Sequence, residues 1–196
     1  MPATRTARRL TPGDVVPPRA LTTMTGRTVD LTSPGALTHL QLRRFAGCPI
    51  CNLHLRSVVG RLEEITAAGV REVVVFHSTA QDLLAYEADL PLDVIPDPDR
   101  RLYSELGVEP AVRALLDPRA VLAMLRGTVH DVVAALRGRG KVPPVTPDGG
   151  MLGRPADLLL APDGTVVAVR YGAHAADQWS VDELLDHARR ARPALG

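Results

Sequence analysis

The sequence predicts an α/β protein with three layers, an α/β/α sandwich in which helices cover both faces of a mixed central sheet. Three observations predict this fold. Strand-like and helix-like segments alternate along the chain, the run from Val73 to Phe76 is apolar on both faces, and a hairpin followed by a helix ends the chain. With 196 residues, 45% of them hydrophobic, we expect a single domain over residues 10–196, preceded by a flexible N-terminus of residues 1–9.

The first half of the chain alternates strand and helix signals. Residues 37–45 alternate apolar and polar side chains imperfectly and lead into a glycine, which predicts a strand. From Pro49 apolar residues recur every three or four positions as far as Gly69, which predicts a helix with a glycine stop. Proline suits the first helical position because its missing N–H would be unpaired there, so Cys48 becomes the N-cap. Short apolar runs and helical periods between turn residues predict the other elements, a hairpin over 20–31, strands over 70–77 and 92–95, and helices over 80–88 and 99–106.

The second half of the chain is expected to complete the sheet with a hairpin. Asp117, which is followed by proline, begins a helical pattern that runs to residue 135, with Gly127 as a candidate for an interruption of this helix. A Gly- and Pro-rich stretch over 138–153 predicts a loop. Two strands, over 156–160 and 165–171, flank a Pro-Asp-Gly turn. A final helix over 180–191 begins with a Ser-x-x-Glu capping box.

Composition and charge argue against several classes of protein. The 23 basic and 22 acidic residues are interspersed and give a net charge of +1, so we expect neither nucleic acid nor an anionic membrane as a partner. The basic N-terminus is not followed by the apolar core of a signal peptide, and no stretch approaches the roughly 20 apolar residues of a membrane span. We therefore expect a cytoplasmic protein. In that reducing compartment a lone Cys-x-x-Cys pair is more often catalytic or metal-binding than a structural disulfide.

The two cysteines, Cys48 and Cys51, lie three residues apart at the start of the predicted helix. Unpaired N–H groups and the positive end of the helix dipole favour a thiolate there, and the thiolate is the nucleophilic form of cysteine. A second sulfur one helical turn along can attack the product that the first has formed and close a disulfide. The spacing therefore predicts a redox-active thiol pair.

Other interpretations of this segment rest on the same residues. Cys48 and Cys51 could be two small buried side chains without chemistry, because cysteine is often buried. A tetrahedral zinc site needs four ligands, and this segment adds only His54, so we expect no metal. Covalent haem attachment would need histidine where Asn52 stands. We expect His54 to be packed or solvent-facing rather than a catalytic base, and His77, at the end of a central strand, has a structural or a site role open to it.

Three segments carry a resemblance to a known family. They are LTPGD at 10–14, RRFAGCPICNLHL at 43–55 and PADLLLAPDG at 155–164. Together they resemble peroxiredoxin-like proteins of the alkyl hydroperoxide reductase/thiol-specific antioxidant family, in the Cys-x-x-Cys-bearing subgroup of the thioredoxin superfamily. The resemblance extends from residue 10 to the C-terminus and implies a thioredoxin-like fold with an N-terminal β extension. It also implies that Cys48 attacks the peroxide and that Cys51 is the resolving cysteine.

The sequence departs from this family at the positions that shape the peroxide pocket. Typical members carry proline and threonine seven and three residues before the attacking cysteine, and these positions hold Gln41 and Phe45 here. The family's arginine before the late strand falls on Pro155, which matches instead the cis-proline that lies against the Cys-x-x-Cys pair in thioredoxins. We expect Phe45, Pro49, Arg154 and Pro155 to support the substrate pocket. Of the nearby arginines, we favour Arg154 over the two that precede Phe45 as the cation that stabilises the thiolate.

Three functions remain open. The resemblance implies a thiol peroxidase, in which Cys48 becomes a sulfenic acid, Cys51 closes a disulfide, and a cellular thiol reductant such as a thioredoxin system restores both thiols. The departures favour a thioredoxin-like oxidoreductase of protein disulfides, because fewer donors would stabilise the oxygen that leaves during peroxide cleavage. The third is a non-catalytic redox-sensing protein that binds a partner. None of these functions needs a cofactor, and a homodimer is compatible with each.

Overall fold

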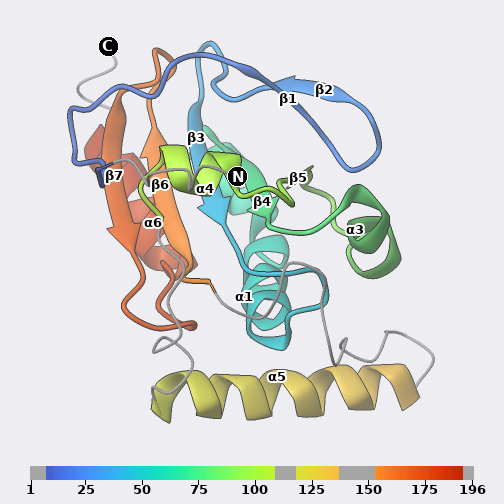
Figure 1. Ribbon diagram of the computed structural model, residues 1–196. Coiled ribbons are helices and arrows are strands. Elements are labelled where there is room, and N and C mark those ends of the chain that lie inside the picture. Colours follow the sequence, from blue (N-terminus) through green and yellow to red (C-terminus); the bar gives the residue numbers. More distant parts are fainter. Residues whose placement is uncertain (1–7, 109–117, 137–152, 192–196) are drawn as a thin grey trace.

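A five-stranded mixed sheet forms the centre of the computed structural model, which describes residues 8–108, 118–136 and 153–191 (Figure 1). The strand order is β5-β4-β3-β6-β7, in which β3, β4 and β5 are parallel and β6 and β7 are antiparallel to their neighbours. The strands are β3 (Leu37–Leu42), β4 (Val70–Phe76), β5 (Asp93–Pro96), β6 (Ala156–Leu160) and β7 (Val166–Tyr171). A separate antiparallel hairpin of β1 (Ala20–Thr22) and β2 (Thr28–Asp30) forms the predicted N-terminal extension.

Helices cover both faces of this sheet, which confirms the predicted three-layer α/β/α fold. The helices are α1 (Pro49–Val59), α2 (Leu62–Ala67), α3 (Ala80–Tyr86), α4 (Arg101–Glu105), α5 (Pro118–Leu136) and α6 (Val181–Ala191). Leu102 of α4 packs against one face, whereas Leu55 of α1, Leu83 of α3 and Leu184 of α6 pack against the other. Among the described residues, no helix is both long enough and apolar enough to cross a bilayer.

Most element boundaries follow the sequence prediction, and two helices differ from it or settle an open point. The helix expected from Pro49 to Gly69 divides into α1 and α2 around Gly60. Helix α5 continues through Gly127 without interruption. The backbone of Pro49 approaches this residue so closely that no side chain would fit there, which explains the glycine. The capping box of α6 is confirmed. The Glu183 backbone N–H donates to Ser180 Oγ at 3.2 Å, and the Ser180 backbone N–H donates to Glu183 Oε2 at 2.8 Å. Residues 138–152 of the predicted loop 138–153 and residues 1–7 of the expected flexible N-terminus lie outside the described residues.

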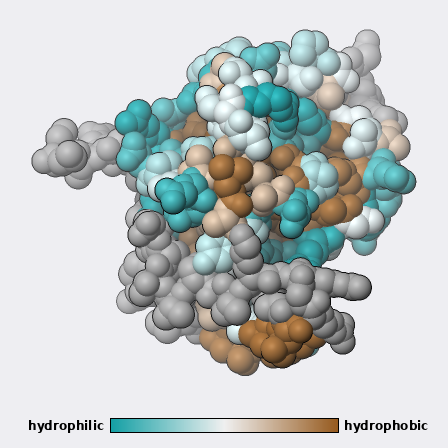
Figure 2. Space-filling model, turned by 90° about the vertical axis from the view of Figure 1, so that its right-hand side faces the viewer, coloured by the Kyte–Doolittle hydropathy of each residue, from teal (hydrophilic) through white to brown (hydrophobic). Residues whose placement is uncertain are grey.

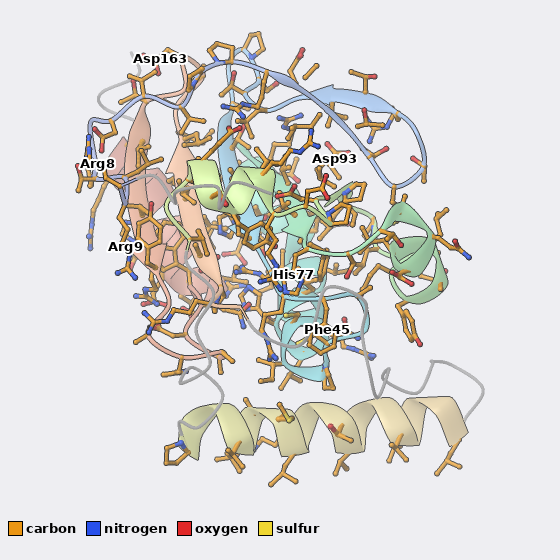
Figure 3. All side chains as sticks on the ribbon, viewed as in Figure 1. Arg8, Arg9, Phe45, His77, Asp93 and Asp163 are labelled. Carbon is orange, nitrogen blue, oxygen red and sulfur yellow. The ribbon has the colours of Figure 1, made fainter. Side chains whose placement is uncertain are left out.

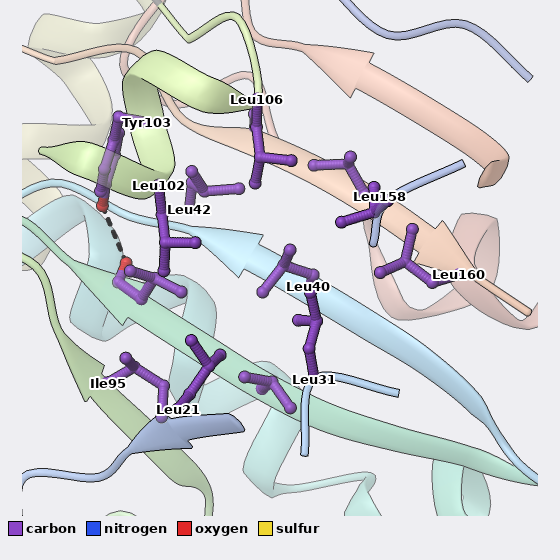
Figure 4. Close-up of a cluster of buried hydrophobic side chains, with 14 of the residues drawn as sticks. Leu21, Leu31, Leu40, Leu42, Ile95, Leu102, Tyr103, Leu106, Leu158 and Leu160 are labelled. Carbon is purple, nitrogen blue, oxygen red and sulfur yellow. Dashed lines mark hydrogen bonds between the residues drawn. The ribbon is translucent and has the colours of Figure 1, made fainter. Parts of the chain in front are cut away.

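The two faces of the sheet differ in chemistry. Figure 4 shows the face under α4, where leucines of β3 and β6 such as Leu40 and Leu158 pack against Leu106 in an entirely apolar cluster. The Tyr103 hydroxyl donates a hydrogen bond of 2.9 Å to the Val75 carbonyl at its edge. The opposite face holds two apolar clusters, one around the cysteines and one around Trp179, together with a group of buried charged side chains.

Candidate active site

Cys48 and Cys51 lie at the N-terminus of α1, just after the chain leaves β3. Gly47 adopts a φ of 73° and turns the backbone, and Cys48 is the N-cap with proline at the next position, as predicted. The Cys48 carbonyl accepts the N–H of Asn52 at 2.9 Å and starts the helical ladder. Both thiols are free, and the Cys51 thiol donates a hydrogen bond to the Cys48 sulfur. The two sulfurs therefore face each other within one helical turn.

Both cysteines are covered by protein. Cys48 is 0% and Cys51 1% exposed, and they belong to an apolar cluster against which Ala123 and Met124 of α5 pack. Figure 1 shows α5 crossing the end of α1. The contact is close, because a Cβ atom placed on Gly127 would lie 2.5 Å from the Pro49 carbonyl oxygen. Helix α5 therefore forms a cover over the start of α1.

The surroundings of Cys48 favour its thiolate. Burial by itself raises the pKa of this thiol, but the hydrogen bond from Cys51, the positive charge of Arg44 and the N–H groups of Cys51 and Ile50 lower the pKa to about 7. The Arg44 Nη1 atom lies 3.7 Å from the Cys48 Sγ atom. Burial and the neighbouring Cys48 sulfur raise the pKa of Cys51 well above its ordinary value. The surroundings thus favour the thiolate at Cys48 over Cys51 and keep the Cys51 thiol protonated at neutral pH.

Two side chains from other parts of the chain hold the turn that carries Cys48. The Ala46 N–H donates to Ser78 Oγ at 3.0 Å, and the Gly47 N–H donates to Glu87 Oε1 at 2.8 Å. The Phe45 ring centroid lies 5.2 Å from the Arg44 guanidinium carbon. Such buried hydrogen bonds fix the backbone and leave little freedom in the position of the sulfur.

His77 lies next to Phe45 beside α1, with the two ring centroids 6.5 Å apart (Figure 3). Burial first, and then the charges of Arg100 and Arg44, lower the pKa of His77 to about 3, so its ring is neutral at physiological pH. Its N–H donates to the Arg44 carbonyl at 3.0 Å and links the ends of β3 and β4. This bond belongs to the backbone and would form with any residue other than proline at position 77, so it assigns neither of the two open roles to the His77 ring.

A second group of polar side chains lies on the same face of the sheet as α1. We call it the charge network, and its members are His39, Gln41, Arg43, His54, Glu72 and Asp157. The Arg43 Nη2 atom lies 2.5 Å from Asp157 Oδ1, and the His39 ring lies 2.8 Å from Glu72 and 3.2 Å from Asp157. Although burial lowers the pKa of His39, the two carboxylates raise it to about 9. His39 is therefore protonated, and two positive side chains face two carboxylates.

The structure places several predicted residues differently from what the sequence suggested. Arg44, not Arg154, brings its guanidinium to the Cys48 sulfur, because the chain from β3 runs directly into the N-terminus of α1. The expected cis-proline was wrong: no described peptide bond is cis, and the Pro155 carbonyl instead accepts the Gly172 N–H at 2.9 Å. Among the described residues, no three His, Cys, Asp or Glu side chains are grouped as metal ligands.

Gln41 and His54 both belong to the charge network and not to the immediate surroundings of the sulfurs. Gln41 Oε1 accepts a hydrogen bond of 3.0 Å from Arg43 Nε, so the position that holds a pocket proline in typical relatives serves a structural contact here. Arg43 Nη2 lies 3.1 Å from His54 Nε2, and burial together with Arg43 lowers the pKa of His54 to about 3. His54 is thus packed, as expected. The sequence signal for this network was a buried charged residue within or directly after a strand, namely Glu72 in β4, Asp157 in β6 and Arg43 after β3.

Comparison with known families gives one match. A family model described as "AhpC/TSA antioxidant enzyme" matches residues 57–174, which is more than half of the chain and begins after Cys51. No curated protein matches the sequence significantly.

Three solved structures that resemble this chain are described as peroxiredoxins or as peroxiredoxin-like. A peroxiredoxin-like protein from Aquifex aeolicus is 14% identical with a TM-score of 0.59, covering 94% of this chain and 90% of its own. The reduced 2-Cys peroxiredoxin of Plasmodium vivax is 11% identical with a TM-score of 0.63, covering 92% and 81%. Peroxiredoxin 6 of Arenicola marina, as a cysteine-to-serine mutant, is 17% identical with a TM-score of 0.61, covering 93% and 74%. At these identities the likeness establishes the fold alone.

Proposed function

Because this chain belongs to the AhpC/TSA antioxidant enzyme family, we propose that it is a cytoplasmic thiol peroxidase in which Cys48 reduces a peroxide and Cys51 resolves the product. The observation that carries this proposal is the pKa of about 7 at Cys48, together with a Cys51 thiol hydrogen-bonded to the same sulfur. About half of the Cys48 side chains would then be thiolate at neutral pH, with the resolving thiol already in place.

The proposed reaction takes two steps at these sulfurs. The Cys48 thiolate attacks one peroxide oxygen, so that an S–O bond forms, the O–O bond breaks, and the leaving oxygen takes a proton to become water or an alcohol. The Cys51 sulfur then attacks the Cys48 sulfenic acid, forms the disulfide, loses its proton and releases water. A cellular dithiol, such as a thioredoxin-type reductant, supplies two electrons and two protons to restore both thiols. Arg44 stabilises the thiolate and is suitably placed to neutralise developing negative charge.

Access to Cys48 requires that its cover move. Because both sulfurs are buried beneath α5, we propose that peroxide enters when α5 lifts away from Pro49. Hydrogen peroxide needs a smaller opening than an organic peroxide or a protein disulfide, so we expect it to react fastest. Exchange with protein disulfides is the second candidate, and the departures at Gln41 and Phe45 from the peroxidase pattern favour it.

The test compares three forms of the reduced protein by stopped-flow kinetics with hydrogen peroxide, tert-butyl hydroperoxide and insulin. The wild type should form the Cys48–Cys51 disulfide with either peroxide, and Cys51→Ser should accumulate a Cys48 sulfenic acid that dimedone traps for mass spectrometry. Cys48→Ser, the matched control that keeps the other thiol, should react at least about 1,000-fold more slowly. Oxidation of Cys48 no faster than free cysteine would refute the peroxidase, and rapid insulin reduction in the same series would select disulfide exchange.

A further inference from the structure

Helix α5 has apolar side chains on two opposite faces. Its inner face meets the cysteine cluster through Ala123, Met124 and Gly127. Its outer face carries a row of exposed side chains that we call the outer row, made of Val121, Leu122, Leu125, Val129, Val132, Val133 and Leu136. Ten large hydrophobic side chains are exposed in the described part of the chain, and seven of them are in this row. Figure 2 shows the corresponding hydrophobic patch at the base of the molecule.

The spacing of the outer row matches the contact line of a helix pair. Its central members, Leu122, Leu125, Val129, Val132 and Leu136, follow one another at steps of three, four, three and four residues. This alternation is the a/d pattern of a coiled coil, in which each apolar side chain enters a gap between residues of a facing helix. Helix α5 has 19 residues and so offers two full heptads. The geometry therefore favours another α-helix as the partner of this face.

A second copy of the chain supplies such a helix with the same apolar row. Two outer rows together would bury on the order of 1,000 Å², which reaches the size that a specific protein interface needs. Leu136 is 83% and Val129 62% exposed, so these side chains gain most from being covered. A membrane surface fits less well, because helices that lie on lipid carry many Lys and Arg residues, and α5 contains two arginines and one aspartate.

We propose that the outer row of α5 is the interface between two copies of this chain, which pair α5 against α5 as a short two-stranded coiled coil. The contact is symmetric, so the same row on each copy forms both halves of the interface. The inner face of the same helix covers Cys48 and Cys51. In the dimer, each α5 would therefore lie between the cysteines of its own copy and the α5 helix of the partner.

Sedimentation velocity of the full chain over a wide concentration range tests this interface. The wild type should be a dimer at high concentration, and Val129→Glu should weaken dimerisation by at least about 100-fold, because each dimer would bury two carboxylates. Leu84→Glu is the matched control, since Leu84 is an exposed leucine on α3, and it should leave the dimer unchanged. A wild type that stays monomeric at every concentration, or a dimer that survives Val129→Glu, would overturn the proposal.

A cross-link provides a second measurement that does not depend on a disruptive charge. Val129 is the centre of the 122–136 row, so it lies next to its own copy whether the two helices are parallel or antiparallel. Val129→Cys, in a chain whose Cys48 and Cys51 are replaced by serine, should form a disulfide-linked dimer under mild oxidation, and Leu84→Cys in the same chain should not. Absence of the Val129 cross-link would contradict the proposal. So would binding of a monomeric chain to anionic phospholipid vesicles that Val129→Glu abolishes, since that result would assign the row to a lipid surface.

Discussion

Two consecutive arginines after the end of β3 lead into two different polar regions. Arg43 enters the charge network, where its guanidinium lies 2.5 Å from Asp157, whereas Arg44 turns to α1, where it lies 3.7 Å from the Cys48 sulfur. Both side chains are 0% exposed. Because a buried guanidinium costs several kcal/mol unless other charges and hydrogen bonds offset it, neither position is neutral for stability. The two arginines differ in the group that each guanidinium faces, a carboxylate for Arg43 and a thiol for Arg44.

In the charge network the partners have fixed charges. Burial raises the pKa of Asp157, but Arg43 and His39 outweigh that effect and hold it below its ordinary value. The carboxylate therefore stays ionised, and the positive charge of Arg43 has a permanent counterpart. At the cysteine the partner is a thiol whose pKa lies near neutrality, so the hydrogen bond from Cys51 and, after it, the positive charge of Arg44 shift the fraction of Cys48 that is thiolate. Arg43 thus lies against a group of fixed charge, whereas Arg44 lies against a group that titrates near neutral pH.

Breaking the charge network should have the largest effect on stability. Asp157→Asn keeps the shape of the side chain but leaves Arg43 and His39 with one fewer carboxylate, so the free energy of unfolding should fall by roughly 3–5 kcal/mol in urea titrations. The thiolate absorbance of Cys48 should still titrate near pH 7. Asp99→Asn is the control, because the exposed Asp99–Arg101 pair should contribute less than about 1 kcal/mol. A small loss for Asp157→Asn would mean that the network does not hold the fold.

The protonated His39 predicts a fall in stability at alkaline pH. Its pKa is about 9 in the folded chain against an ordinary 6.5, so its stabilising contribution is complete below pH 6.5 and is lost as the pH rises through 9. The free energy of unfolding should fall by up to about 3 kcal/mol across this window. Urea unfolding of His39→Gln at the same pH values is the control, since this variant should lose that part of the slope. Equal slopes in both proteins would show that folding does not raise the pKa of His39.

The sequence predicted the framework of the site well. The placement of Cys48 followed from Pro49, whose preference for the first helical position is a local property of the chain. The strands followed from apolar runs, and the start of α6 from a capping box of residues three apart. Each of these signals depends on neighbours within a few positions, which is why one sequence was enough.

The polar partners could not be predicted in the same way. Arg43 meets Asp157 across 114 residues and His39 meets Glu72 across 33, so only the pairing of β3 with β4 and β6 brings these groups together. The choice of Arg154 over Arg44 failed for the same reason, because residue spacing does not tell which side chain turns toward the sulfur. The sequence could not tell whether Gly127 breaks the helix, because a glycine in a helix can also mark the place where another backbone comes close.

Replacing each of the two candidate cations in turn tests which of them stabilises the Cys48 thiolate. Arg44→Met should raise the pKa of Cys48 above 7 and lower its alkylation rate with iodoacetamide at pH 7 by about fivefold or more, because fewer molecules carry a thiolate. Arg154→Met is the matched control and should leave both the pKa and the rate unchanged. The pH dependence of alkylation gives both quantities. If Arg154→Met produced the larger shift, Arg44 would not be the cation that activates Cys48.

The smallest expected change concerns helix α5, which covers Cys48. A substitution in this helix alters access to the Cys48 sulfur without altering the charges around it. Gly127→Ala improves helix propensity by about 0.8–1.0 kcal/mol, but its new methyl group would lie 2.5 Å from the Pro49 carbonyl oxygen, so α5 must shift outward. The two effects oppose each other in the free energy of unfolding, whereas the alkylation rate of Cys48 should rise about two- to threefold because opening becomes easier. Arg126→Ala, at an exposed position of the same helix, should not change that rate. An alkylation rate that stays constant in Gly127→Ala would mean that reagents reach Cys48 by a route that α5 does not control, and burial beneath this helix would then have no part in its reactivity.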